Sequence, residues 1–85
     1  MDAKSLRALV DAAAIKRVRI VAQGDVFHVE IDAPGRSFTI ETAKGGLRTW
    51  RSIDATAKWL RSVGIAESLL NVSQWAPAQR GLPLS

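Results

Sequence analysis

The sequence predicts an α+β domain in which two helices pack on one face of an antiparallel sheet of four strands plus a short fifth. Apolar residues recur at helical spacing near both ends of the chain, and they alternate at every second position between residues 18 and 40. The 85 residues are enough for only one hydrophobic core. We therefore expect a single domain over residues 1–77 and an extended or disordered tail over residues 78–85.

The first 14 residues have the pattern of a short amphipathic helix. Asp2 is placed to cap its N-terminus. The residues expected to face the core are Leu6, Leu9, Val10 and Ala13.

The next segments predict a β-hairpin with its turn at Gly24-Asp25. A two-residue turn pairs Gln23 with Val26, and this fixes every pair behind it. The apolar face then contains the pairs Ala22–Phe27, Ile20–Val29 and Val18–Ile31. The opposite face contains the charge pairs Arg19–Glu30 and Arg17–Asp32. Both faces agree on one register.

A second turn at Pro34-Gly35 returns the chain into a third strand. The same register places Ile31 opposite Phe38, Val29 opposite Ile40, and His28 opposite Glu41. We expect the last of these to be a cross-strand pair on the surface.

The second half of the chain predicts two more strands and a helix. Leu47–Trp50 is long enough for a fourth strand, and Leu69–Val72 for a short fifth one. Between them, Ser52 caps a helix that ends at Gly64. The residues of this helix expected to face the core are Ile53, Ala57, Leu60 and Val63.

The net charge of +4 is unevenly distributed along the chain. Five basic residues are opposed only by Asp54 and form a candidate surface for nucleic-acid phosphates: Lys44, Arg48, Arg51, Lys58 and Arg61. The alternative is a solvated face, with Asp54 paired to Lys58 along the helix and Arg48 paired to Glu41.

The composition argues against catalysis. The chain has no cysteine and a single histidine, His28, and its carboxylates show no spacing that would gather metal ligands. Lys44-Gly45-Gly46 lacks the spacing and the terminal Lys-Ser/Thr of a phosphate-binding loop. We therefore expect a protein that is not an enzyme and that has no cofactor and no metal.

The sequence predicts a cytoplasmic protein with no membrane partner. No stretch of the chain is long and apolar enough to span a bilayer. The first residues also fail as a signal peptide, because Asp2 and Asp11 interrupt the pattern.

Each of the three tryptophans could either pack in the core or stack on a nucleic-acid base. We expect Trp59 to cover the edge of the core and Trp75 to hold the tail against the body. Trp50 is either buried or exposed as a platform for a nucleic-acid base, and burial is favoured because large aromatic side chains are mostly buried.

Several segments resemble the ParC-type partition-associated proteins of plasmids and integrative elements. They are residues 5–10, 46–54, 57–60, 64–65 and 71–77, with the sequences SLRALV, GLRTWRSID, AKWL, GI and NVSQWAP. The resemblance implies a role in the maintenance of a plasmid or mobile element.

Two functions remain open at this point. The first is a non-catalytic accessory protein that binds DNA through the five basic residues. The second is a protein-interaction module that binds a partition or mobilisation protein, or forms a homodimer, without contacting nucleic acid. Binding to phosphates weakens steeply as salt rises, so salt dependence separates the two.

Overall fold

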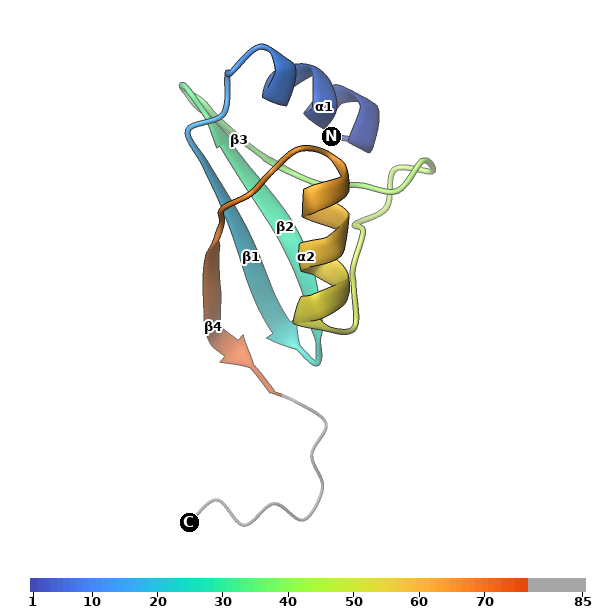
Figure 1. Ribbon diagram of the computed structural model, residues 1–85. Helices are drawn as coiled ribbons and strands as arrows, with labels where there is room; N and C mark the ends of the chain where they lie inside the picture. Colours follow the sequence, from blue (N-terminus) through green and yellow to red (C-terminus); the bar gives the residue numbers. More distant parts are fainter. Residues whose placement is uncertain (77–85) are drawn as a thin grey trace.

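The computed structural model describes residues 1–76 as an α+β fold. The elements are α1 (Ala3–Asp11), β1 (Arg17–Gly24), β2 (Val26–Ala33), β3 (Arg36–Thr39), α2 (Ile53–Ser62) and β4 (Leu69–Trp75). The strands form one sheet in the order β3-β2-β1-β4, with α2 in front of it and α1 across one end (Figure 1). Leu6 of α1 and Leu60 of α2 belong to the same core as the inward residues of the sheet.

The register predicted for the first hairpin is confirmed. β1 and β2 pair antiparallel with Gln23 opposite Val26 at the turn and Arg19 opposite Glu30 further along. β3 follows with Phe38 opposite Ile31, again as expected. Alternation and turn chemistry are local signals, and here they determine three of the strands.

The all-antiparallel sheet of four strands plus a fifth is wrong. The sheet has four strands and is mixed, because β4 runs parallel to β1. Leu47–Trp50 is no strand of this sheet and forms only isolated bridges, Glu41 with Leu47 and Phe27 with Trp50. Trp50 exchanges two backbone hydrogen bonds of 2.8 Å with Phe27, so the segment touches the sheet at its ends without forming a continuous ladder.

Both helices begin at the predicted caps. The Asp2 carboxylate accepts a hydrogen bond from the Ser5 amide at 2.8 Å, and the Ser52 hydroxyl accepts one from the Ala55 amide at 3.0 Å. Each cap satisfies an amide that has no partner within the helix.

The predicted inward faces of the helices need two corrections. Ala13 lies beyond the end of α1, with a φ of 55°, and is exposed. In α2 the buried residue is Thr56 and not Ala57, because the inward stripe runs at spacings of three and four from Ile53 through Leu60. The Thr56 hydroxyl donates to the Ser52 carbonyl at 2.8 Å, so its burial leaves no unpaired polar atom.

Gly64 ends α2 as predicted. Its φ of +94° is a conformation that other residues rarely adopt, and a Cβ there would lie 3.2 Å from Cγ1 of Val10. The amide of buried Ile65 donates to the Leu60 carbonyl at 3.0 Å. The chain therefore turns tightly from α2 toward β4.

The predicted tail, residues 78–85, and the domain boundary at Pro77 lie outside the described residues. Within residues 1–76, neither helix has the length and apolarity needed to cross a membrane.

Candidate nucleic-acid interface

Three of the five predicted basic residues lie on the outward side of α2 or just before its N-terminus. Arg51 immediately precedes the cap Ser52, while Lys58 and Arg61 are one helical turn apart. All three are exposed. Their spacing places them on a common side of the helix, opposite the stripe that packs on the sheet.

Arg48 is held against two aromatic rings. Its guanidinium carbon lies 5.2 Å from the ring centroid of Trp50 and 5.0 Å from that of Trp59. The two rings are themselves 5.1 Å apart. This geometry restricts the guanidinium through cation–π contacts while Arg48 stays partly exposed.

The alternative pairing of Arg48 with Glu41 is not formed. The Glu41 carboxylate instead lies 3.3 Å from the amino group of Met1. Within residues 1–76, none of the five basic residues takes part in an ion pair, and this includes the expected pair of Asp54 with Lys58.

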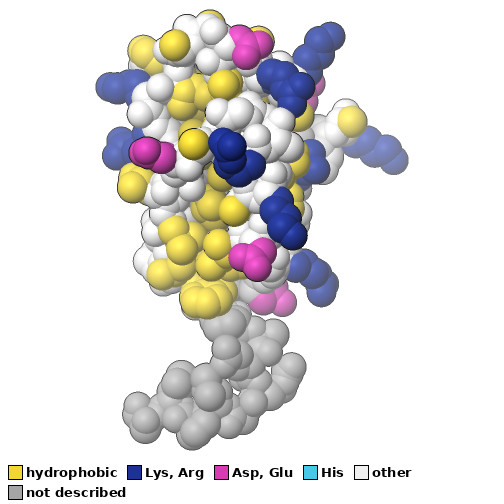
Figure 2. All heavy atoms as spheres, viewed as in Figure 1, with side chains coloured by type: hydrophobic (Ala, Val, Ile, Leu, Met, Phe, Trp, Pro, Cys, Tyr) yellow, Lys and Arg dark blue, Asp and Glu magenta, His cyan; other side chains and the backbone are white. Residues whose placement is uncertain are grey.

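Lys44 lies apart from the other four. It belongs to a turn over residues 42–46, which the Thr42 amide closes by donating to the Gly46 carbonyl at 2.7 Å. This turn projects from the body (Figure 1). Lysine and arginine side chains are concentrated on the same side of the molecule in Figure 2, the right-hand side, while hydrophobic side chains gather at the lower left.

The tryptophans are placed at the edges of the core. Trp59 covers the core edge as predicted, and Trp50 is half-buried against the same cluster. This agrees with the favoured prediction of burial, and the Trp50 ring already contacts Trp59 and Arg48. Trp75 is 43% exposed, with its ring 6.2 Å from that of Phe27.

Sequence reasoning missed the contact of Arg48 with both rings. The signal available was the spacing Arg48-Thr49-Trp50, since residues two apart in extended backbone share a side. The contribution of Trp59 depends on how α2 packs, which no local pattern reveals.

The surface pair of His28 with Glu41 is wrong. His28 is buried, with 7% of its surface exposed, and its Nε2 lies 2.8 Å from a carboxylate oxygen of Glu30. The other oxygen of Glu30 lies 2.7 Å from the Arg19 guanidinium. Glu30 therefore links His28 to the ion pairs between β1 and β2.

Asp32 is the centre of those ion pairs. Hydrogen bonds from Arg19, and then from the Ser37 hydroxyl, lower the pKa of Asp32 to about 2. The same partnership raises the pKa of Arg19. The Arg19 guanidinium is shared between Glu30 and Asp32, so its charge is largely satisfied within the sheet.

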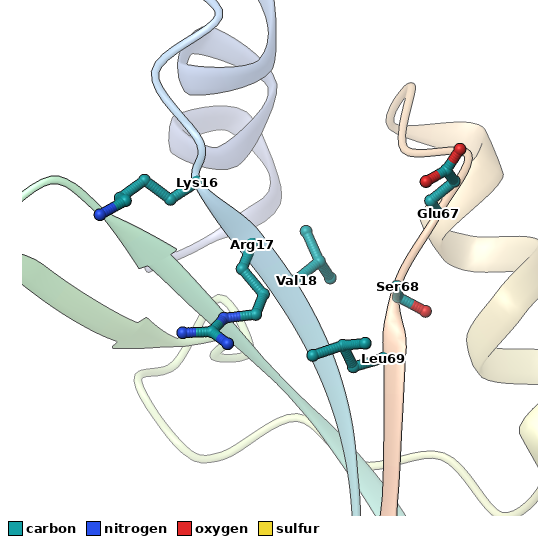
Figure 3. A pocket seen from close by; sticks show the side chains of 6 residues that line it. All are labelled: Lys16, Arg17, Val18, Glu67, Ser68 and Leu69. Atoms are coloured by element: carbon teal, nitrogen blue, oxygen red, sulfur yellow. The ribbon is translucent and has the colours of Figure 1, made fainter.

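A shallow pocket of about 430 Å³ opens where β1 and β4 begin. Figure 3 shows its lining residues, Lys16, Arg17, Val18, Glu67, Ser68 and Leu69. Lys16 and Arg17 extend away from β4, whereas Glu67 lies on the β4 side of the pocket and points away from them (Figure 3). Arg17 is bound to Asp32 at 3.1 Å. The pocket thus brings together no set of groups aimed at one point.

Residues 1–76 contain no group of three or more histidine, aspartate or glutamate side chains that could hold a metal ion. The arrangement that remains is the basic surface formed by Arg48, Arg51, Lys58 and Arg61. Its chemistry is attraction of anions without a reacting group.

A family model described as ParC-like matches residues 1–79, which confirms the resemblance found in the sequence. Neither a curated protein nor a solved structure matches the chain.

Proposed function

Since the chain belongs to the ParC-like family, we propose that it is a non-catalytic accessory protein of plasmid or mobile-element maintenance that binds the phosphate backbone of DNA. The observation that carries the proposal is the basic surface of Arg48, Arg51, Lys58 and Arg61, whose charges have no acidic partner in the part of the chain described. Lys44 lies on a separate turn and is not counted among these contacts.

The elements that carry these side chains favour contacts to phosphates over contacts to bases. The side of α2 that contains Thr56 and Leu60 is packed against the core, so only its outward side can face DNA. Long basic side chains on its outward side can still reach phosphate oxygens. Such contacts position a protein on DNA without reading its sequence.

Arg48 has a particular role in this proposal. A guanidinium can bind a phosphate through two parallel hydrogen bonds. Contacts with Trp50 and Trp59 already restrict its position, so less side-chain freedom is lost when it binds. We therefore expect Arg48 to contribute more to binding than the freely exposed Lys58.

The proposed surface is small, and this limits the affinity. Four phosphate contacts correspond to a slope of about −3 to −4 in a plot of log K against log salt concentration. Binding should therefore be measurable at low salt and nearly lost at physiological salt. Unrelated DNA sequences should give the same result.

The test is fluorescence anisotropy with duplex and single-stranded DNA of two unrelated sequences across a salt series. The double variant Lys58→Ala/Arg61→Ala should weaken binding. Its matched control, Lys4→Ala/Lys16→Ala, removes the same charge from outside the basic surface and should have a smaller effect. The proposal fails if the wild-type protein binds neither DNA at low salt. It also fails if both double variants weaken binding equally, since the attraction would then be diffuse.

A further inference from the structure

A second pocket opens where β1 starts, β2 ends and the chain turns into β3. Its volume is about 610 Å³. Arg17 and Asp32 reach it from the face of the sheet away from the helices, because they alternate with Val18 and Ile31 of the core. The charged residues that line this pocket are Lys16, Arg17, Arg19, Asp32 and Arg36.

The lining of the second pocket is positive. Four of its charged side chains are basic and one is acidic, which leaves a net charge of +3. Glu30 also binds Arg19, at 2.7 Å, and counting it still leaves two positive charges. Within residues 1–76, neither Lys16 nor Arg36 takes part in an ion pair. The positive charge of this pocket is therefore not neutralised by the part of the fold described.

Asp32 holds Arg17 in place and leaves its outer nitrogens available. Arg17 donates to Asp32 through Nε alone, at 3.1 Å, and neither of its terminal nitrogens has a hydrogen-bond partner among the described residues. The pKa of Asp32 is about 2, lowered first by Arg19 and then by Ser37, so this carboxylate is charged at neutral pH. It therefore acts as a fixed anchor for Arg17.

Lys16 and Arg36 are also restricted. The Lys16 amide donates to the Asp32 carbonyl at 2.7 Å, which fixes the backbone from which this side chain extends. The Arg36 guanidinium carbon lies 5.0 Å from the ring centroid of Phe38. Lys16 and Arg17 both extend away from β4, on the side of β1 where β2 and β3 lie (Figure 3). Less side-chain freedom is therefore lost when these cations bind a common anion.

We infer that the second pocket binds a compact polyphosphate anion through Lys16, Arg17 and Arg36. A guanidinium binds phosphate oxygens through parallel hydrogen bonds, and an ammonium adds a point charge. Linked phosphoryl groups concentrate several negative charges in a small volume, which suits cations gathered around one pocket. The volume of the pocket lies in the range of small-molecule sites, and its charged lining favours a charged ligand over an apolar one.

This pocket is separate from the basic surface proposed to bind DNA. The basic surface lies on the outward side of α2, and α2 lies in front of the sheet (Figure 1). The pocket receives its charged side chains from the face of the sheet away from the helices. A DNA segment bound along α2 therefore leaves the pocket open, and the two kinds of binding can be tested apart.

The first test is a titration of the isotopically labelled full chain with inorganic pyrophosphate, followed by heteronuclear NMR at constant ionic strength. Saturable shifts are expected for amides around the pocket, those of Lys16, Arg17, Gly35 and Ser37. Sulfate should bind about ten-fold more weakly or less, since it carries fewer charges and oxygens for charge-assisted hydrogen bonds. The inference is overturned if no shift saturates, or if the amides of α2 shift as strongly, because net charge alone would then attract the anion.

The second test compares two double variants by calorimetric titration with pyrophosphate. Lys16→Ala/Arg36→Ala should weaken binding by about ten-fold or more, because hydrogen bonds to charged groups are lost. Its matched control, Lys58→Ala/Arg61→Ala, removes the same charge from the basic surface and should leave pyrophosphate binding nearly unchanged. All four side chains are exposed, and urea melts check that both variants are folded. Equal weakening by the two variants would overturn the inference, whereas a wild type that binds pyrophosphate and no DNA would overturn only the proposed function.

Discussion

The guanidinium of Arg19 donates two hydrogen bonds to the carboxylate of Asp32, one from Nε at 3.1 Å and one from Nη2 at 2.8 Å. Arg17 and the Ser37 hydroxyl bind the same carboxylate at 3.1 and 2.7 Å. Asp32 thus ties β1, β2 and β3 together on the face of the sheet away from the helices. Its charged form is favoured in the folded state, and this has a consequence for acid stability.

We expect part of the stability of the fold to be lost between about pH 4 and pH 2 through Asp32. Its pKa falls from 3.8 to about 2 in the folded chain, so its contribution is fully present above pH 3.8 and is lost as the pH falls through the folded value. Urea unfolding at pH 5, 3.5 and 2 measures this. Asp32→Asn should be less stable than the wild type at pH 5, and the difference should shrink at pH 2. The exposed turn variant Asp25→Asn serves as the control and should follow the wild type at every pH.

Leu60→Ala should destabilise the protein by roughly 2–5 kcal/mol, the usual cost of such a change in a core. Leu60 is 3% exposed and packs where α2 meets the sheet. The control is Leu47→Ala, the same substitution at a side chain that is 47% exposed, which should cost within about 0.5 kcal/mol. Equal effects in urea melts would show that α2 does not pack on the sheet as described.

Arg48→Ala should change the tryptophan emission of the folded protein and destabilise it by about 1 kcal/mol, because two partly exposed cation–π contacts are lost. Arg51→Ala, which removes the same charge from a side chain without such contacts, should leave emission and stability unchanged. Fluorescence spectra and fluorescence-detected urea melts provide both measurements. An unchanged spectrum in Arg48→Ala would contradict the stacked geometry.

Lys58→Ala should leave the melting temperature nearly unchanged and reduce the steepness of the salt dependence of DNA binding by about 0.9, the value for one phosphate contact. The affinity for unrelated sequences should fall by the same factor, because phosphates carry no sequence information. Lys4→Ala on α1 is the control with the same loss of charge. If the two variants give identical slopes, Lys58 makes no direct contact.

The parts of the fold that could be predicted from the sequence are those set by neighbours along the chain. The pair Arg19–Glu30 follows from the turn at Gly24-Asp25, because a two-residue turn fixes the register behind it. The caps Asp2 and Ser52 follow from residue type and position. Each of these depends on contacts within a few residues.

Apart from the inward positions of Ala13 and Ala57, which were misplaced within the helices, the errors concern contacts between distant segments. The direction of β4 depends on its pairing with β1, and no local pattern of Leu69–Trp75 states whether that pairing is parallel. His28 was expected opposite Glu41, yet Glu41 binds Met1 from the far end of the chain. For the candidate interface, the outward positions of Lys58 and Arg61 followed from helical spacing, whereas the stacking of Arg48 on Trp59 required the packing of α2.

The parallel pairing of β1 with β4 also shapes how the chain is made. β1 leaves the ribosome early and pairs at once with β2, but its other edge waits until β2, β3, α2 and finally β4 have been synthesised. Such long-range pairing forms slowly, because distant segments must first be brought together. Throughout that interval the nascent chain presents the open edge of a well-formed strand, and it is then most exposed to association with other nascent chains. Rapid synthesis of the last third of the chain, or a chaperone that covers the open edge of β1, should therefore benefit this protein more than one whose strands pair in sequence order.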